Sequence, residues 1–183
     1  MHCRYVSAAL AFATLPLAGC GNPDTGPKSI EEAQEEAAKL DRPRPGQYKQ
    51  TMTVTRFEVP NAPPEMAEQF KAALGQGHDT QFCLTEDMAQ QGFKDMFREI
   101  GKDGECAYER FDVAGNKLDA VLNCESAAEG KGRITLSGTV GPEGSVVEVN
   151  IDSDNPNSPV GKTRIGMQMV SERLGDCAAV AKD

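Results

Sequence analysis

The chain has 183 residues, enough for one ordinary domain with appendages but not for two full domains. Its formal charge of −9 at pH 7 disfavours nucleic acids and anionic membrane surfaces as working partners, because both would repel it. Aromatic residues make up only 5% of the chain and tryptophan is missing, which excludes a large aromatic core and suggests that covalent cross-links support the fold.

Residues 1–19 have the features of a secretory leader. Arg4 is their only charged residue, and residues 6–17 form an apolar run that is shorter than the roughly 20 residues of a membrane-spanning helix. The run ends in a motif that resembles the lipobox of bacterial lipoproteins, Leu17-Ala18-Gly19-Cys20. The resemblance implies cleavage between Gly19 and Cys20 and attachment of acyl chains, palmitate included, to Cys20. Because Gly21 rather than Asp follows, we expect a lipid anchor in the outer membrane with the protein facing the periplasm.

Residues 20–46 are interpreted as a lipidated tether or stalk. Residues 22–28 are rich in turn formers and show no periodicity. Ser29 and Glu32 then have the spacing of a capping box, and strong helix formers follow them, so a short helix is predicted. Its apolar face is limited to Ile30, Ala33, Ala37 and Leu40. A face this weak favours a solvated stalk over a partner-binding helix.

Residues 47–178 form the predicted domain, and residues 179–183 a tail. Residues 48–59 are rich in Thr, Val and aromatic residues with apolar side chains at even spacing, which predicts a strand. A helix is expected from Pro64 to a Gly75 cap, with one face made by Met66, Phe70 and Leu74. A second helix is expected from a Thr85 cap to Gly101, with an apolar stripe made by Met88, Phe93, Met96, Phe97 and Ile100.

The second half of the domain is predicted to be mostly strand. Residues 106–113 and 117–124 flank a hairpin turn, and alternating apolar residues follow in 134–140 and 146–151. Residues 152–159 are expected to be a loop, and residues 163–174 fit a strand better than a helix. We therefore expect an α+β fold: a curved antiparallel sheet or partly open barrel with two short helices, stapled by disulfides.

Four cysteines remain once Cys3 is removed and Cys20 is lipidated, and an even number in an exported chain predicts two disulfides. A hairpin turn centred on Gly115 places Cys106 opposite Cys124, within disulfide reach. The pair Cys83–Cys177 then follows by elimination. A four-cysteine metal site is the alternative, but the CxxC spacing typical of such sites is missing.

Five short motifs follow one another between residues 45 and 178: Pro45-Gly46-Gln47-Tyr48, Cys83-Leu84-Thr85, Cys106-Ala107-Tyr108, Cys124 after the hairpin, and Gly175-Asp176-Cys177. In this order, and with the lipobox, the chain resembles a bacterial envelope family catalogued only as a domain of unknown function, number 3617. The resemblance implies the compartment, the fold and the disulfides, and it implies no catalytic residues. The long loop at residues 152–159 departs from the family and leaves the register of the last strand open.

Signatures of catalysis are weak. The single histidine of the mature chain, His78, lies in a glycine-flanked segment and is interpreted as a turn residue, and no G-x-S-x-G motif accompanies it. Asp112 and Asp119 are expected to face each other across the hairpin as an exposed pair. Residues 152–154 begin like a calcium loop, but Pro156 occupies the third ligand position. We therefore expect no catalytic residues, no cofactor and no enzymatic activity.

Met167 and Met169 are the remaining candidates for a site. On a strand both thioethers project from one face, and such soft ligands suit Cu(I), with His78 as a possible third ligand. Methionine is also an irregular core filler, and in a chain without tryptophan we favour this interpretation.

The leading hypothesis is a non-enzymatic binding or structural lipoprotein of the cell envelope. Its partners would be the membrane through Cys20 and, in addition, a small apolar ligand on the inner sheet face or another envelope protein. The alternatives are a periplasmic copper-handling protein that uses Met167 and Met169, and an enzyme with an unrecognised site.

Overall fold

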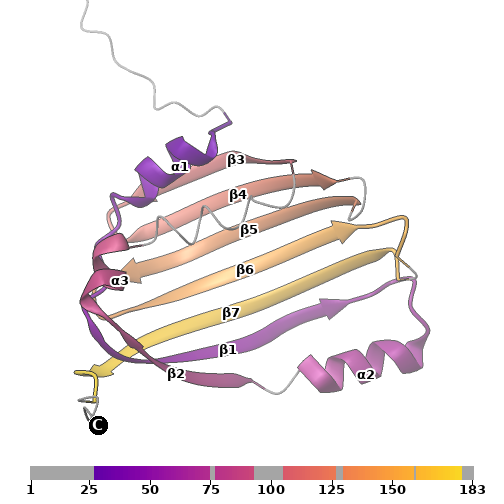
Figure 1. Ribbon diagram of the computed structural model, residues 1–183. Helices are drawn as coiled ribbons and strands as arrows, with labels where there is room; N and C mark the ends of the chain where they lie inside the picture. The colour runs from indigo at the N-terminus through magenta and orange to yellow at the C-terminus, as the bar shows by residue number, and fades with distance from the viewer. Residues whose placement is uncertain (1–26, 75–76, 93–104, 127–129, 159, 179–183) are drawn as a thin grey trace, which may run out of the picture.

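The computed structural model describes residues 27–74, 77–92, 105–126, 130–158 and 160–178. These residues form one open antiparallel sheet of seven strands in the order β2-β1-β7-β6-β5-β4-β3 (Figure 1). The strands are β1 (Gly46–Glu58), β2 (His78–Leu84), β3 (Glu105–Ala114), β4 (Lys117–Ser126), β5 (Gly130–Gly141), β6 (Gly144–Asp154) and β7 (Lys162–Gly175). The predicted α+β class is confirmed, and the sheet is curved and open rather than closed into a barrel.

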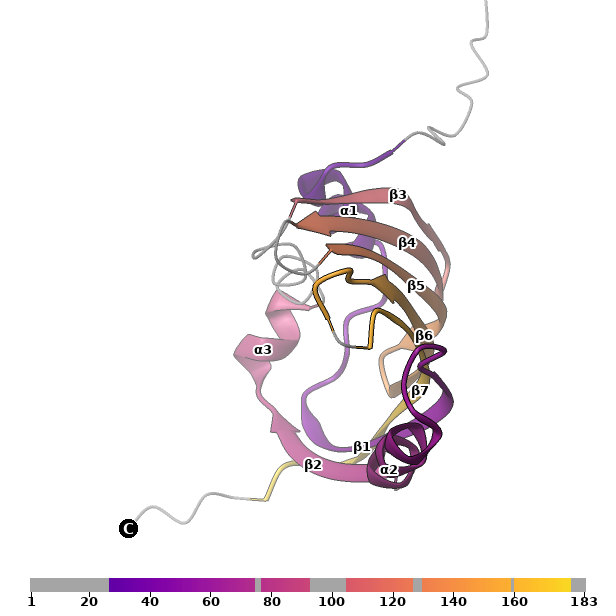
Figure 2. The same cartoon turned by 90° about the vertical axis from the view of Figure 1, so that its right-hand side faces the viewer.

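Three short helices accompany the sheet in the described part of the chain: α1 (Ile30–Ala37), α2 (Pro64–Leu74) and α3 (Glu86–Gln91). The sheet curves toward the side that carries α1 and α3, which makes this side the concave face (Figure 2). Helix α2 lies along the β1–β2 margin, with 41% of Met66 exposed, so it does not lie across the sheet. Thr85 caps α3 by accepting a hydrogen bond from the Met88 amide at 3.3 Å, as predicted. The expected continuous helix from Thr85 to Gly101 is wrong, because α3 ends at Gln91 and Gly92 caps it with a φ of 60°. Residues 93–104 lie outside the described residues.

The core lies between α1 and the β3–β4 hairpin. Its fully buried members come from the helix and both strands: Ala33, Ala37, Tyr108, Phe111, Leu118, Ala120 and Leu122. Tyr108 and Phe111 are three residues apart, yet both face inward because the register shifts between Tyr108 and Arg110 and inserts an extra residue. Their rings meet edge to face with centroids 5.2 Å apart.

Helix α1 corrects the interpretation of residues 30–40 as a solvated stalk. The capping box is present: Ser29 accepts from the Glu32 amide and Glu32 accepts from the Ser29 amide. The small side chains of Ala33 and Ala37 let the helix approach β3 closely, and both are at most 2% exposed. A narrow face of alanines is therefore sufficient here, because close approach replaces side-chain bulk.

Three strands bear on the remaining expectations. His78 is the first residue of β2, paired with Met52, and is not a turn residue. Residues 163–174 are strand, as predicted, and β7 is held on both sides, by β6 and by β1. The loop that was expected to begin at residue 152 begins after Asp154, because β6 continues to that residue.

Candidate functional site: the concave face of the sheet

Three rows of apolar side chains cross the concave face from β5 or β6 to β1. In strand register these apolar rows are Ile134, Ile151, Ile165 and Phe57; Leu136, Val149, Met167 and Val54; and Val147, Met169 and Met52. All of these side chains are half-buried. The rows continue the core that α1 covers, since Ile134 and Leu136 also pack against the buried cluster.

The rows arise from the alternation of side chains along the strands. In β6, Val147 and Val149 face the concave side, while Glu148 between them faces the convex side and accepts a hydrogen bond from Gln168 of β7 at 2.6 Å. The same period of two recurs in β7, and in β1 as far as Val54. A register shift between Val54 and Arg56 then inserts an extra residue into β1, so that Phe57 also faces the concave side. Because these residues are paired from strand to strand, the apolar side chains of four strands form one continuous surface.

The described helices cover only part of this surface. Helix α1 packs on β3 and α2 contacts β1, and these are the main helix–strand packings among the described residues. The apolar side chains of β6 and β7 lie beyond the cluster beneath α1 and remain half-buried. An apolar surface that is only half-buried is suited to bind an apolar molecule.

Tyr108 lies in the core next to this face and carries an unusual hydroxyl. The residue is 1% exposed, and its hydroxyl has no hydrogen-bond partner among the described residues. Burial raises the pKa of Tyr108 to about 12. Tyr48, which is also buried, differs because its hydroxyl donates to the Arg44 and Pro142 carbonyls, 2.8 and 3.1 Å away.

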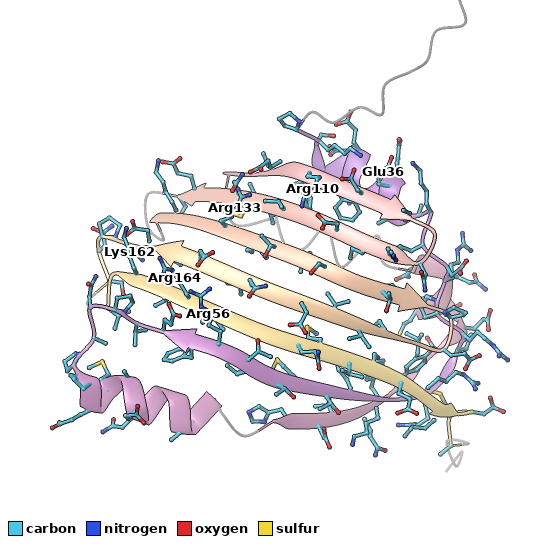
Figure 3. The ribbon with its side chains drawn as sticks, turned by 180° about the vertical axis from the view of Figure 1, so that it is seen from behind. Glu36, Arg56, Arg110, Arg133, Lys162 and Arg164 are labelled. Carbon is cyan, nitrogen blue, oxygen red and sulfur yellow. A yellow bond between two sulfur atoms is a disulfide. The ribbon has the colours of Figure 1, made fainter. Side chains whose placement is uncertain are left out.

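The convex face is polar and its charges are paired. An open hollow of about 930 Å³ lies at one end of β5, β6 and β7. Several cations line it, and Figure 3 shows four of them, Arg56, Arg133, Lys162 and Arg164. Each has a carboxylate partner; Arg164, for example, lies 3.2 Å from Glu58 and 3.5 Å from Asp152. These carboxylates neutralise the cations, so the hollow offers no surplus positive charge to an anion.

Hydrogen bonds on this face stabilise the ionised carboxylates. Arg133, and secondarily Asn123, hold the pKa of Glu109 at about 2. Arg56 and Arg164 lower the pKa of Glu58 in the same way. Asp112 and Asp119 face each other as predicted, are both more than half exposed, and share Arg110 as an ion-pair partner. The pKa values of Glu58 and Glu109 lie well below neutral pH, so both carboxylates stay ionised. Such groups are poorly suited to general acid–base catalysis.

The residues of the copper hypothesis are only partly brought together. Met167 and Met169 share the concave face, but His78 is separated from Met169 by β1, with Met52 between them. Two strand spacings are about 10 Å. Among the described His, Cys, Asp and Glu residues, no group of three is placed to hold a metal ion. Met52, which is paired with Met169 across β1 and β7, was missed because its partner strand lies more than 100 residues away.

The cysteines are joined in the predicted pairs. Cys106–Cys124 links β3 to β4 with Cα atoms 4.0 Å apart, and Cys83–Cys177 links β2 to the chain end with Cα atoms 5.5 Å apart. Gly19 and Cys20 lie outside the described residues, so lipid attachment remains a prediction. No helix in the described part of the chain is long and apolar enough to cross a membrane.

Comparison with known proteins gives one assignment. No curated protein and no solved structure matches the chain significantly. Residues 43–177 match the family described as "Protein of unknown function (DUF3617)", a stretch that runs from just before β1 to the second cysteine of the Cys83–Cys177 disulfide. The matched segment contains the whole sheet and both disulfides, and the chain belongs to the DUF3617 family.

Proposed function

We propose that the protein is a lipid-anchored cell-envelope protein that binds a small apolar ligand, such as an acyl chain, on the concave face of its sheet and does not transform it. The observation that carries the proposal is the half-buried apolar surface formed by the three rows on β5, β6, β7 and β1. Burial of each methylene group of an acyl chain contributes about 0.8 kcal/mol. An acyl chain that lies along a row of three or four strands would therefore gain enough free energy for useful affinity.

Two observations support binding rather than chemistry. The carboxylates with lowered pKa values, Glu58, Asp79 and Glu109, lie at the protein surface in pairs with Arg or Lys, where they favour the charged form. The concave rows, in contrast, consist of aliphatic, thioether and phenyl groups, which have no acid–base function near pH 7.

Anchoring is tested with a pair of cysteine variants. Cys20→Ser should abolish acylation and leave precursor or soluble protein, while Cys3→Ser, which changes a leader residue, should leave the protein in the membrane fraction. Metabolic labelling with a palmitate analogue measures the acylation directly. Membrane retention of a cleaved Cys20→Ser protein would refute the anchoring proposal.

Ligand binding is tested with two adjacent valines on opposite faces of β6. Val147 belongs to the third apolar row, whereas Val146 lies on the convex face and is 42% exposed. We expect Val147→Gln to weaken binding of a fluorescent long-chain fatty acid by about tenfold, equivalent to 1.4 kcal/mol, and Val146→Gln to leave it unchanged. If both variants bind equally and only Val147→Gln is destabilised, the face is covered from within the chain and the ligand proposal fails.

A further inference from the structure

The chain enters the fold at one fixed point on the edge of the sheet. The Lys28 amide donates to the Tyr108 carbonyl at 2.8 Å, which makes Lys28 an extra antiparallel bridge outside β3. Its ammonium group donates to the Phe111 carbonyl at 2.8 Å and lies 3.8 Å from Glu36 and 4.0 Å from Asp112. Only 13% of the Lys28 side chain is exposed, so these contacts are shielded from solvent.

Helix α1 strengthens this attachment directly after Lys28. Ser29 is its N-cap, and Ala33 and Ala37 are buried against the β3–β4 cluster. Residues 28–37 therefore belong to the rigid domain, and only the residues between Cys20 and Lys28 are left to act as a tether.

This tether is short compared with the domain. Eight peptide steps separate Cys20 from Lys28, which allows a reach of at most about 29 Å even when fully extended. The sheet spans six strand spacings from β3 to β2, a width of about 29 Å as well. For the sheet to stand upright with β2 at the membrane and β3 on the far side, the tether would have to extend along the entire width of the sheet.

We infer that the β3–α1 edge is the membrane-facing edge of the domain and that β2 forms its distal edge; the inference rests on the acylation of Cys20 proposed above. The edge faces the bilayer without inserting into it, because α1 exposes Glu31, Glu32 and Glu35 at this end. These carboxylates repel an anionic headgroup layer over a range of about 8 Å at physiological salt. The concave face then opens to the side, where it is accessible to ligands that leave or enter the membrane.

The orientation is measured by energy transfer from two labelled positions to an acceptor on lipid headgroups. Ala107→Cys on β3 and Gln81→Cys on β2 are both exposed, both on the convex face and each on an edge strand, so they form a matched pair. The lipidated full-length protein is reconstituted in vesicles, and retention of both native disulfides is checked by peptide mapping. We expect higher transfer from position 107 than from position 81.

A longer tether provides the control. Twenty Gly and Ser residues inserted after Gly26 add about 70 Å of reach, and we expect the difference between the two positions to be lost. Equal transfer from both positions at the native tether length would overturn the inference. Protein that remains in solution, with no transfer from either position, would instead show that the acylation proposal is wrong.

Discussion

The buried hydroxyl of Tyr108 gives a prediction with an unusual sign. A buried hydroxyl without a partner costs about 1–3 kcal/mol of desolvation. Tyr108→Phe removes only this oxygen and keeps the ring that packs on Phe111. We therefore expect the free energy of unfolding to rise by about 1 kcal/mol, which corresponds to an increase in Tm of about 2–4 °C for a chain of this size.

Tyr48→Phe is the matched control. Tyr48 is 3% exposed, and its hydroxyl donates to two backbone carbonyls, so removal of the oxygen should lower the free energy of unfolding by about 0.5–1.5 kcal/mol. Both values are measured by urea denaturation with the disulfides intact. A loss of stability in Tyr108→Phe equal to that in Tyr48→Phe would show that the Tyr108 hydroxyl has a partner and would refute the reasoning.

The pH dependence supplies a second readout of the same change. Burial raises the pKa of Tyr108 from its ordinary value of 10.0 to about 12. The folded state therefore disfavours the phenolate, and the contribution of this residue to stability is complete below pH 10 and lost as the pH rises through 12. The alkaline loss of stability should be smaller in Tyr108→Phe than in the parent protein.

Three other outcomes are expected. Hydrogen bonds hold the pKa of Glu109 at about 2, so its contribution to stability is present above pH 4.5 and lost as the pH falls toward 2. Glu109→Gln should therefore reduce the loss of stability over this pH range in an acid denaturation curve. An unchanged curve would contradict the assignment. Replacement of Cys106 and Cys124 by Ala opens an 18-residue loop and should lower the free energy of unfolding by about 3 kcal/mol; urea denaturation measures the loss, and full stability would count against a structural role. Met167→Leu should retain fatty-acid binding because the side-chain volume is conserved, whereas loss of Cu(I) binding by titration in that variant would favour the copper hypothesis.

Strand positions were predictable from sequence because alternation is a local signal. The even spacing of Tyr48, Met52 and Val54 identified β1, and period two identified residues 163–174 as strand. The partner of a strand that pairs with a distant part of the chain was not predictable in the same way. β1 pairs with β7, whose residues lie more than 100 positions away, so the apolar rows that cross both strands could be recognised only in the folded sheet.

The position of the hairpin turn predicts the correct cysteine pair, but only because a β-bulge compensates for an error of one residue in the predicted register. A turn centred on Gly115 predicts that Cys106 faces Cys124, and the structure has this pair. Near the turn, however, the register is one residue different, with Ala114 opposite Lys117. The bulge between Tyr108 and Arg110 restores the predicted register at the cysteines. Bulges depend on both strands, and the sequence of one strand does not reveal them.

The failure at α1 has a different cause. Hydrophobic pattern measures how much apolar surface a helix presents, and by that measure residues 30–40 are weak. The helix packs because Ala33 and Ala37 are small and because Tyr108 and Phe111 on β3 supply the bulk that α1 lacks. The relevant complementarity lies in the partner surface, which a scan of the helix alone cannot detect.

The position of β1 between β2 and β7 decides when the sheet can be completed. The first strand of the chain forms one ladder with its neighbour in sequence and a second ladder with the last strand, from Gln47 with Gly175 to Glu58 with Arg164. Closure of this second ladder brings together the two ends of the domain, which is the slowest kind of contact to form because of the chain entropy it removes. Until β7 is available, β1 has one unpaired edge and its apolar side chains lack their neighbours. Folding intermediates of this protein should therefore expose an unpaired, aggregation-prone edge on β1. Truncation at the C-terminus should cause aggregation rather than give a smaller stable domain.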